Sequence, residues 1–219
     1  MRVNVYSDKF SGTLSAAEVL KVIKSVFKNF DIQANYFPVT DGGEHSTEIF
    51  KHYNIQTENV SMKKDFVGSW IPAEYLNING DVYFESASLI GVNKTSEHPF
   101  NLNTAALSQV IPEIDVLGLG GSKTVDGGIG LLSCLGIDFY AGEEIITNPK
   151  PKDFKDITAV KVNDSFSNLE LKVLTDTSTR LLGSNSAVAM YGPQKGLNKK
   201  EIKHLEEQLE RIFQIVSTE

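Results

Sequence analysis

The chain has 219 residues, of which 41% are hydrophobic and 22% charged, and its formal net charge is -7. This length and composition are typical of a soluble globular protein that buries a sizeable core, and they exclude wholesale disorder. An acidic chain lacks the basic patches that hold a nucleic-acid backbone, so we expect no nucleic-acid partner.

The cysteine content and the apolar runs indicate in which cellular compartment the protein is expected. Cys134 is the single cysteine and cannot form an internal disulfide, which favours the reducing cytoplasm. It lies in an apolar run at residues 129–135, where we expect a small core residue. Residues 1–6 are too short and polar for a signal peptide, and no stretch approaches the ~20 apolar residues of a membrane span. We therefore expect a cytoplasmic protein without a membrane partner.

The first part of the chain alternates strand and helix patterns. Residues 2–6 alternate polar and apolar side chains, as in a strand. Ser15 and Glu18 have the spacing of a capping box, and the apolar residues that follow recur at helical spacing. Residues 34–39 predict a second strand, which leads through a glycine-rich loop into a helix ending near His52. The order is strand, helix, strand, helix.

Beyond Phe66 the pattern changes to short β runs. Asn79-Gly80 joins two of them, and this dipeptide is typical of a type I′ hairpin turn. The expected elements, in chain order, are strands at 73–78 and 82–85, a short helix at 103–110, a buried strand at 116–119, a helix near 129–135 and a strand at 169–174. The fold class is therefore α/β, a layered sheet with flanking helices. We expect two lobes, at residues 1–66 and 67–219.

The C-terminal segment predicts a long amphipathic helix. Asn198 and Glu201 have cap-like spacing at its start, and apolar residues line one face. On the other face Glu207 and Arg211 have the i,i+4 spacing of an ion pair. His204 is expected at the surface. The four histidines show no metal-ligand spacing, so no metal site is predicted.

Several predicted strands are followed by an aspartate: Asp8, Asp41, Asp126 and Asp176. In open α/β sheets, ligands lie beyond the carboxyl ends of strands. A single aspartate at such a place is more often a helix cap or a turn former. Four at corresponding places favour a shared cleft.

The segment from Gly120 to Gly130 is the most informative loop. Its glycines let successive backbone N–H groups surround an anion, and Ser122, Lys123 and Thr124 add further donors. It matches neither a Walker A loop nor a dinucleotide-binding fingerprint. A tight structural turn is the alternative.

Two further loops offer ligand groups. In Thr40–Ser46, Asp41 and Glu44 are suited to a substrate hydroxyl or Mg²⁺, although Glu44 also fits the acidic first turn of a helix. In Gly192-Pro193-Gln194-Lys195-Gly196, Gln194 and Lys195 offer donors to a carboxylate or phosphate. A plain turn before the last helix is almost as consistent with this segment.

Taken in order, these segments resemble the bacterial glycerate kinase family, which phosphorylates glycerate at its 2-hydroxyl with ATP. Asp8-Lys9-Phe10-Ser11-Gly12-Thr13-Leu14-Ser15-Ala16 is similar to the family's D-S-F-K-G-S-L-S-A opening. Asp41-Gly42-Gly43-Glu44 and the segment from Gly120 to Gly130 match its D-G-G-E and G-G-S-A-T-N-D-G-G-A-G motifs. Tyr191-Gly192-Pro193-Gln194-Lys195-Gly196 matches its F-G-P-Q-K-G. The resemblance covers essentially the whole chain.

The resemblance implies a kinase that uses ATP and Mg²⁺ on a small anionic, glycerate-like substrate. Asp126 or Asp176 would orient or deprotonate the attacking hydroxyl, through Mg²⁺ in one version of the mechanism. The substrate-binding residues implied are Asp8, Gly12, Asp41, Gly42, Gly43, Glu44, Gly120, Gly121, Ser122, Lys123, Gln194 and Lys195.

Departures from the family pattern leave alternatives open. Val125 replaces the family's asparagine before Asp126, and Lys9 and Ser11 exchange the family's serine and lysine. The chain also lacks the family's downstream P-G-A-G-A-A-G-G-L-G and T-G-E-G-x-x-D motifs. The alternatives are a truncated, non-catalytic paralogue that binds a hydroxy acid or its phosphate, and one half of a split kinase. The partner would be a second copy, as a homodimer, or a separately encoded C-terminal half.

Overall fold

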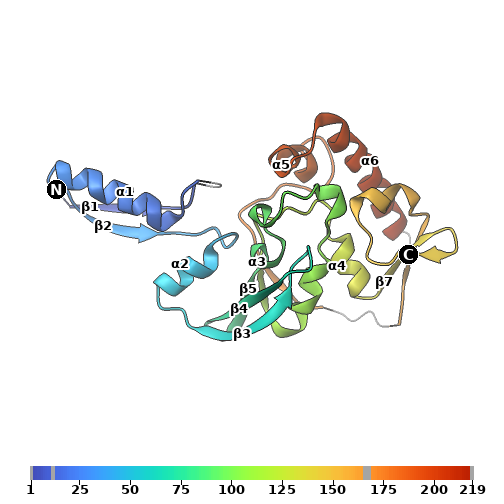
Figure 1. Cartoon of the computed structure of the whole chain (residues 1–219), viewed down its shortest axis with the longest axis horizontal. Helices are drawn as coiled ribbons and strands as arrows, with labels where there is room; N and C mark the ends of the chain where they lie inside the picture. The colour runs from blue at the N-terminus through green and yellow to red at the C-terminus, as the bar shows by residue number, and fades with distance from the viewer. Residues whose placement is uncertain (1, 11–12, 165–168, 218–219) are drawn as a thin grey trace.

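A computed structural model describes residues 2–10, 13–164 and 169–217 of the chain. Gly12, a predicted substrate residue, lies outside the described residues. The described strands form three sheets, and Figure 1 shows a small N-terminal unit standing apart from a larger body. No helix among the described residues has the length and apolar character needed to cross a membrane.

The N-terminal unit is a single βαβ crossover. Strands β1 (Arg2–Ser7) and β2 (Gln33–Pro38) pair in parallel, and helix α1 (Ala16–Asn29) connects them. Ser15 and Glu18 form the predicted capping box. The apolar face of α1 packs on the two strands, so the expected strand, helix, strand order is confirmed.

The larger body is built on a five-stranded sheet in the order β10-β6-β5-β4-β3. Its strands are β3 (Thr57–Lys64), β4 (Trp70–Ile78), β5 (Asp81–Glu85), β6 (Val116–Gly118) and β10 (Lys172–Leu174). β5, β6 and β10 run parallel, whereas β3, β4 and β5 are antiparallel. The predicted hairpin turn is confirmed, because Asn79 and Gly80 both have positive φ.

The lobe boundary expected at residue 66 conflicts with this pairing. β3 was not predicted, and it pairs with β4 in the same sheet. A division at Phe66 would cut the turn between these two paired strands. Strand pairing favours a boundary near residue 40 instead, between β2 and the five-stranded sheet.

The third sheet, in the order β8-β7-β9, contributes to a large apolar core cluster. Its strands are β7 (Ile137–Ala141), β8 (Glu144–Ile145) and β9 (Ala159–Val162). Helix α6 (Lys199–Val216) places Leu205, Leu209 and Ile212 in the apolar cluster with this sheet. The Asn198–Glu201 capping box is present and His204 is exposed, as expected.

The remaining elements are short. The helices are α2 (Ser46–His52), α3 (Ala87–Ile90), α4 (Ile129–Cys134) and α5 (Ala187–Lys195). The segments of 3-10 helix are Val92–Lys94, Pro99–Asn101, Ala105–Gln109, Ile111–Glu113 and Pro151–Asp156. The short helix expected at 103–110 is therefore a 3-10 turn.

Three local expectations are wrong. Cys134 is exposed rather than in the core, because it ends the six-residue helix α4, whose buried positions are at the other end. Arg211 donates to the carbonyl oxygens of Phe154 and Ile157 and to Gln208, and Glu207 pairs with Lys203 instead. The guanidinium group carries five N–H donors in a fixed fork, so it can bond to both carbonyl groups at once. The Gly192–Lys195 segment is the last turn of helix α5 rather than a loop.

β6 ends at a close backbone contact. A Cβ atom on Gly118 would lie 2.2 Å from the carbonyl oxygen of Gly42 and 2.4 Å from the Tyr83 hydroxyl oxygen. The Tyr83 hydroxyl donates to that same carbonyl at 3.1 Å. Glycine at 118 therefore lets a second segment of the chain lie directly on the end of the strand.

This contact predicts that Gly118→Ala destabilises the fold. We expect a loss of about 2–3 kcal/mol in urea unfolding, since the methyl group must displace backbone. Gly68→Ala is the matched control, because a Cβ there meets open space and costs only about 1 kcal/mol of left-handed strain. Equal losses in the two variants would contradict this account.

Candidate functional site

The candidate site lies where three parallel strands of the central sheet end. Glu85, Gly118 and Leu174 are in register at the carboxyl ends of β5, β6 and β10. The segment 41–47 crosses all three. Glu85 accepts hydrogen bonds from the His45 and Thr47 amides, Gly118 lies under the Gly42 carbonyl, and a Cβ on Gly42 would be 3.1 Å from Leu174 Cβ.

Two predicted glycine motifs are in direct contact here. We call residues 41–44 the DGGE loop and residues 120–123 the GGSK loop. A Cβ on Gly43 would lie 2.9 Å from the Leu119 carbonyl oxygen, and one on Gly121 would lie 2.6 Å from Glu44 Cβ. Any larger residue would separate the loops, so close approach explains why both are glycine-rich.

The GGSK loop presents unused backbone donors. Gly120 and Gly121 are exposed and have positive φ. Within the described part of the chain, no acceptor is recorded for the N–H groups of Gly120, Gly121 or Ser122. Successive free N–H groups in such a turn form a concave site for an anionic oxygen. The anion-binding interpretation of this loop is therefore geometrically sound.

An ion pair joins the DGGE loop to Lys9, which lies in the loop after β1. Lys9 Nζ donates to Asp41 Oδ2 at 3.0 Å, and the Gly43 amide donates to Asp41 Oδ1 at 2.8 Å. Burial opposes ionisation of Asp41, but these bonds outweigh it and hold the pKa of the carboxyl below its usual range. Asp8 accepts from the Lys9 amide, so three strand-end residues gather in one place.

A pocket of about 250 Å³ opens beside this ion pair. Its lining combines cationic, amide, imidazole and hydroxyl groups with one carboxylate and two apolar side chains, from Lys9, Phe10, Thr13, Leu14, Ser15, Glu18, His45 and Asn93. Asn93 also donates to Glu44 at 3.2 Å. Sequence reasoning missed His45 and Asn93 as lining residues. His45 stands inside a recognised motif, whereas no sequence signal marks Asn93.

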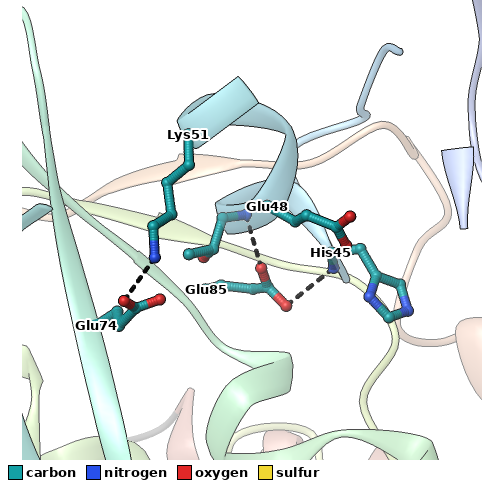
Figure 2. Close-up of a pocket in the computed structure, with 6 residues that line it drawn as sticks. His45, Glu48, Lys51, Glu74 and Glu85 are labelled. Atoms are coloured by element: carbon teal, nitrogen blue, oxygen red, sulfur yellow. Dashed lines mark hydrogen bonds and ion pairs between the residues drawn. The ribbon is translucent and has the colours of Figure 1, made fainter. Parts of the chain in front are cut away.

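A second pocket of about 420 Å³ lies at the start of α2 (Figure 2). The buried Glu85 carboxylate accepts hydrogen bonds from the His45 and Thr47 amides, and Lys51 pairs with Glu74 at 2.7 Å. Figure 2 shows the Glu85 carboxylate beside His45, with Lys51 directed toward Glu74. Glu85 thereby satisfies donors at the helix N-terminus. These bonds fix α2 on β5, a role that the sequence did not assign to Glu85.

Lys195 reaches from α5 to the GGSK loop. Its Nζ donates to Ser122 Oγ at 3.2 Å and to the Thr124 carbonyl at 2.8 Å. Burial lowers the pKa of Lys195 to about 8, with Asp126 acting in the opposite direction and Lys123 in the same one. Gln194, next to it, is exposed. Of the two predicted donors, only Lys195 is tied to the loop.

Asp126 lies beneath the loop and is 1% exposed. Its Oδ2 accepts from the Thr104 amide, the Thr104 hydroxyl and the Gly130 amide at 2.7–2.9 Å. Its Oδ1 is buried without a partner among the described residues. Burial raises the pKa of this carboxyl. The geometry makes Asp126 an anchor of the loop, with no oxygen open to a ligand.

Asp176 has the opposite character. It is exposed two residues beyond Leu174, whose side chain packs on Gly42. Thr177, Thr179 and Tyr191 form a hydroxyl cluster next to it. Asp176 thus follows a strand whose last residue meets the DGGE loop, whereas Asp126 is withdrawn into the core.

The described residues contain no group of three or more His, Cys, Asp or Glu side chains that could cage a metal ion. Mg²⁺ in phosphoryl-transfer sites is commonly bound through one or two carboxylates and the substrate phosphates. Asp41 and Asp176 supply carboxylates of that kind. The free amides of the GGSK loop, with Lys123, suit phosphate oxygens.

Comparison with known proteins identifies relatives along the whole chain. A model of the glycerate kinase family matches residues 3–219. The chain is 29% identical to the glycerate kinase of Halalkalibacterium halodurans over 97% of its own length and 60% of that protein, and 26% identical to glycerate 2-kinase of Escherichia coli K12 over 99% and 61%. A solved structure assigned as glycerate kinase 2 from Salmonella typhimurium LT2 superposes with a TM-score of 0.70 at 22% identity, covering 100% of this chain and 63% of that one. The chain thus spans about 60% of the length of the curated relatives it matches.

The bonds of Asp126 predict a contrast between two substitutions. Asp126→Asn keeps an oxygen where three donors converge but buries an NH₂ group that has no acceptor, so it should cost about 1 kcal/mol. Asp126→Ala leaves three buried donors unsatisfied and should cost about 3 kcal/mol in urea unfolding. An Asp126→Asn variant as unstable as Asp126→Ala would show that charge, rather than hydrogen bonding, is what the site requires.

The lowered pKa of Lys195 predicts a pH dependence of stability. Between about pH 8 and its unfolded value of 10.5 the unfolded state binds more protons, so the free energy of unfolding should rise with pH. We expect this lysine to contribute a rise of about 2 kcal/mol, measured by urea unfolding from pH 7.5 to 10. Lys195→Met should lack that component, and the exposed Lys200→Met control should keep it. A rise unchanged in Lys195→Met would contradict the prediction.

Proposed function

The chain belongs to the glycerate kinase family, and on that premise we propose that its strand-end loops phosphorylate D-glycerate at the 2-hydroxyl with ATP. The observation that carries the proposal is the contact between the DGGE and GGSK loops. It puts a carboxylate ion pair, free backbone amides and Lys195 around the ends of β5, β6 and β10.

In this proposal the pocket of about 250 Å³ beside the Lys9–Asp41 ion pair holds the substrate. Lys9, Asn93 and His45 would receive the glycerate carboxylate, and the Asp41 carboxylate would accept a substrate hydroxyl. Asp8, Gly42, Gly43 and Glu44 would shape the DGGE side of the site. Gly12 and the exposed Gln194 remain predicted contacts.

The GGSK loop would hold the group that is transferred. Its free amides at Gly120, Gly121 and Ser122, with Lys123, would neutralise phosphoryl oxygens, and Lys195 would fix the loop from behind. ATP with Mg²⁺ would supply the phosphoryl group. Of the two predicted catalytic aspartates, the exposed Asp176 is suited to take the hydroxyl proton. Asp126 would act as a positioning residue.

The departures from the family pattern at Lys9, Ser11 and Val125 support a second candidate function. A non-catalytic paralogue would bind glycerate or a related hydroxy-acid phosphate as a sensor, without nucleotide. In a split kinase, activity would need a further polypeptide. The single cysteine is consistent with the reducing cytoplasm, where we expect either activity.

Calorimetry with D-glycerate and with ATP-Mg separates these functions. The kinase proposal predicts binding of both ligands and formation of phosphoglycerate. Asp41→Asn should weaken glycerate binding at least about tenfold. Asp81→Asn is the matched control: it alters a lysine-paired aspartate at the opposite end of β5 and should have no effect. Asp176→Asn should lower kcat more than it raises KM.

Each other outcome is informative. Glycerate binding without ATP binding favours the sensor, and glycerate binding that Asp41→Asn leaves unchanged would move the substrate away from the DGGE loop. Absence of glycerate binding would overturn the proposal for this chain.

A further inference from the structure

Strand β3 is an edge of the five-stranded sheet, and β4 is its single neighbour among the described strands. Edge strands in native proteins are ordinarily protected by bulges, charges or covering groups, because an open edge pairs with other strands. β3 has such protection at both ends. Its register with β4 shifts at Glu58, and the Gln109 side chain bonds to the backbone N–H and the backbone C=O of Lys64.

The middle of β3, residues 59–63, lacks this protection. The backbone groups of an edge strand point alternately toward its neighbour and away from it, so those of Val60 and Met62 point outward as those of Lys64 do. Within the described chain, no hydrogen bond of these outward groups is recorded. The Val60 and Met62 side chains are 50% and 55% exposed. The middle of the strand is therefore both unpaired and apolar.

The open stretch has its midpoint at Ser61, and this symmetry fits a second copy of the same strand. An antiparallel copy centred on Ser61 places Val60 across from Met62 of the second copy, and Met62 across from its Val60. All of these residues have outward backbone groups, so each pair can exchange two hydrogen bonds. Beyond them, Glu58 of each copy stands across from Lys64 of the other. The strand is thus complementary to itself in charge as well as in shape.

Other arrangements of two copies fit less well. Parallel pairing would place Lys63 and Lys64 beside the same lysines of the second copy, which is unfavourable. An antiparallel shift of two residues in one direction would need the backbone groups of Lys64, which Gln109 occupies. A shift in the other direction would run the ladder through the bulge at Glu58. The register centred on Ser61 uses the unprotected stretch alone.

We propose that two copies of this chain associate edge to edge through β3, antiparallel about Ser61, so that their five-stranded sheets become one continuous sheet. Val60 and Met62 of both copies then form an apolar cluster on the exposed face of the sheet. Trp70, which is 62% exposed and lies across from Lys64 on β4, flanks that cluster. A ladder this short makes a small interface, so we expect a micromolar dissociation constant. The inference does not require the proposed kinase activity.

Sedimentation velocity over about 1–100 μM protein tests the association without substrate. The unmodified chain should shift from monomer to dimer across this range. Val60→Lys/Met62→Lys should raise the dissociation constant at least about tenfold, because it places four like charges in the cluster. The matched control is Val22→Lys/Val26→Lys on α1, where the side chains are 54% and 45% exposed. That variant should dimerise as the unmodified chain does.

A charge exchange tests the register. Glu58→Lys should weaken the dimer, because it puts a lysine across from Lys64 of the second copy. Glu58→Lys/Lys64→Glu should restore it, since the two ends are again opposite in charge. Circular dichroism of each variant distinguishes loss of association from loss of fold, and restoration by the double substitution does so independently.

Cysteine crosslinking locates the axis between the copies. In a Cys134→Ser background, Ser61→Cys should form a disulfide-linked dimer under mild oxidation, because residues opposite one another at such a position have Cα atoms about 4.5 Å apart. Lys63→Cys is the control. The two copies of residue 63 would be four residues apart along the strands, about 13 Å, which is too far for a disulfide.

Three results would overturn the proposal. They are a monomer throughout the concentration range, a dimer that Val60→Lys/Met62→Lys leaves unchanged, and crosslinking of Lys63→Cys as efficient as that of Ser61→Cys. None of these measurements involves glycerate or ATP, so a failure here is distinguishable from a failure of the proposed function.

Discussion

The structure depends on how the segment 41–47 crosses the ends of three parallel strands. Each strand end makes a different contact with it: Glu85 accepts backbone amides, Gly118 allows van der Waals contact with a carbonyl group, and Leu174 packs on a glycine. The segment therefore has one available position. That position brings the DGGE loop against the GGSK loop, and every polar feature of the candidate site follows from it.

Two ionisable groups beneath the surface, Asp126 and Lys195, hold the GGSK loop and the residues after it in place. Asp126 satisfies three donors and holds the turn, whereas Lys195 ties Ser122 and Thr124 to α5. Burial disfavours the charged form of both, so the protein keeps them at a cost in stability. Rigid support of free N–H groups is what a site for a transferred anion requires. Asp41 is half-buried and paired with Lys9, whereas Asp176 is exposed.

Local patterns predicted much of the fold, because they act within a few residues. The capping boxes at Ser15 and Asn198 and the Asn79-Gly80 turn were confirmed, since each depends on side chains next to the backbone that they stabilise. β3 escaped prediction because its pairing with β4 is supplied by another segment. Arg211 bonds to carbonyl groups more than fifty residues away in the sequence instead of pairing with Glu207. Cys134 is exposed because it lies at the end of a short helix.

The sequence by itself determined the family and the glycine and aspartate motifs, because close approach and anion binding demand particular residue types at fixed spacing. Only the tertiary structure decided which of these residues are open to solvent. Asp126 and Asp176 look alike in sequence, yet one is buried under three donors and the other is exposed. The same holds for α1, where Val26 and Phe30 recur at helical spacing in the sequence and yet are exposed. Burial is set by the segments packed around a residue, and those come from distant parts of the chain.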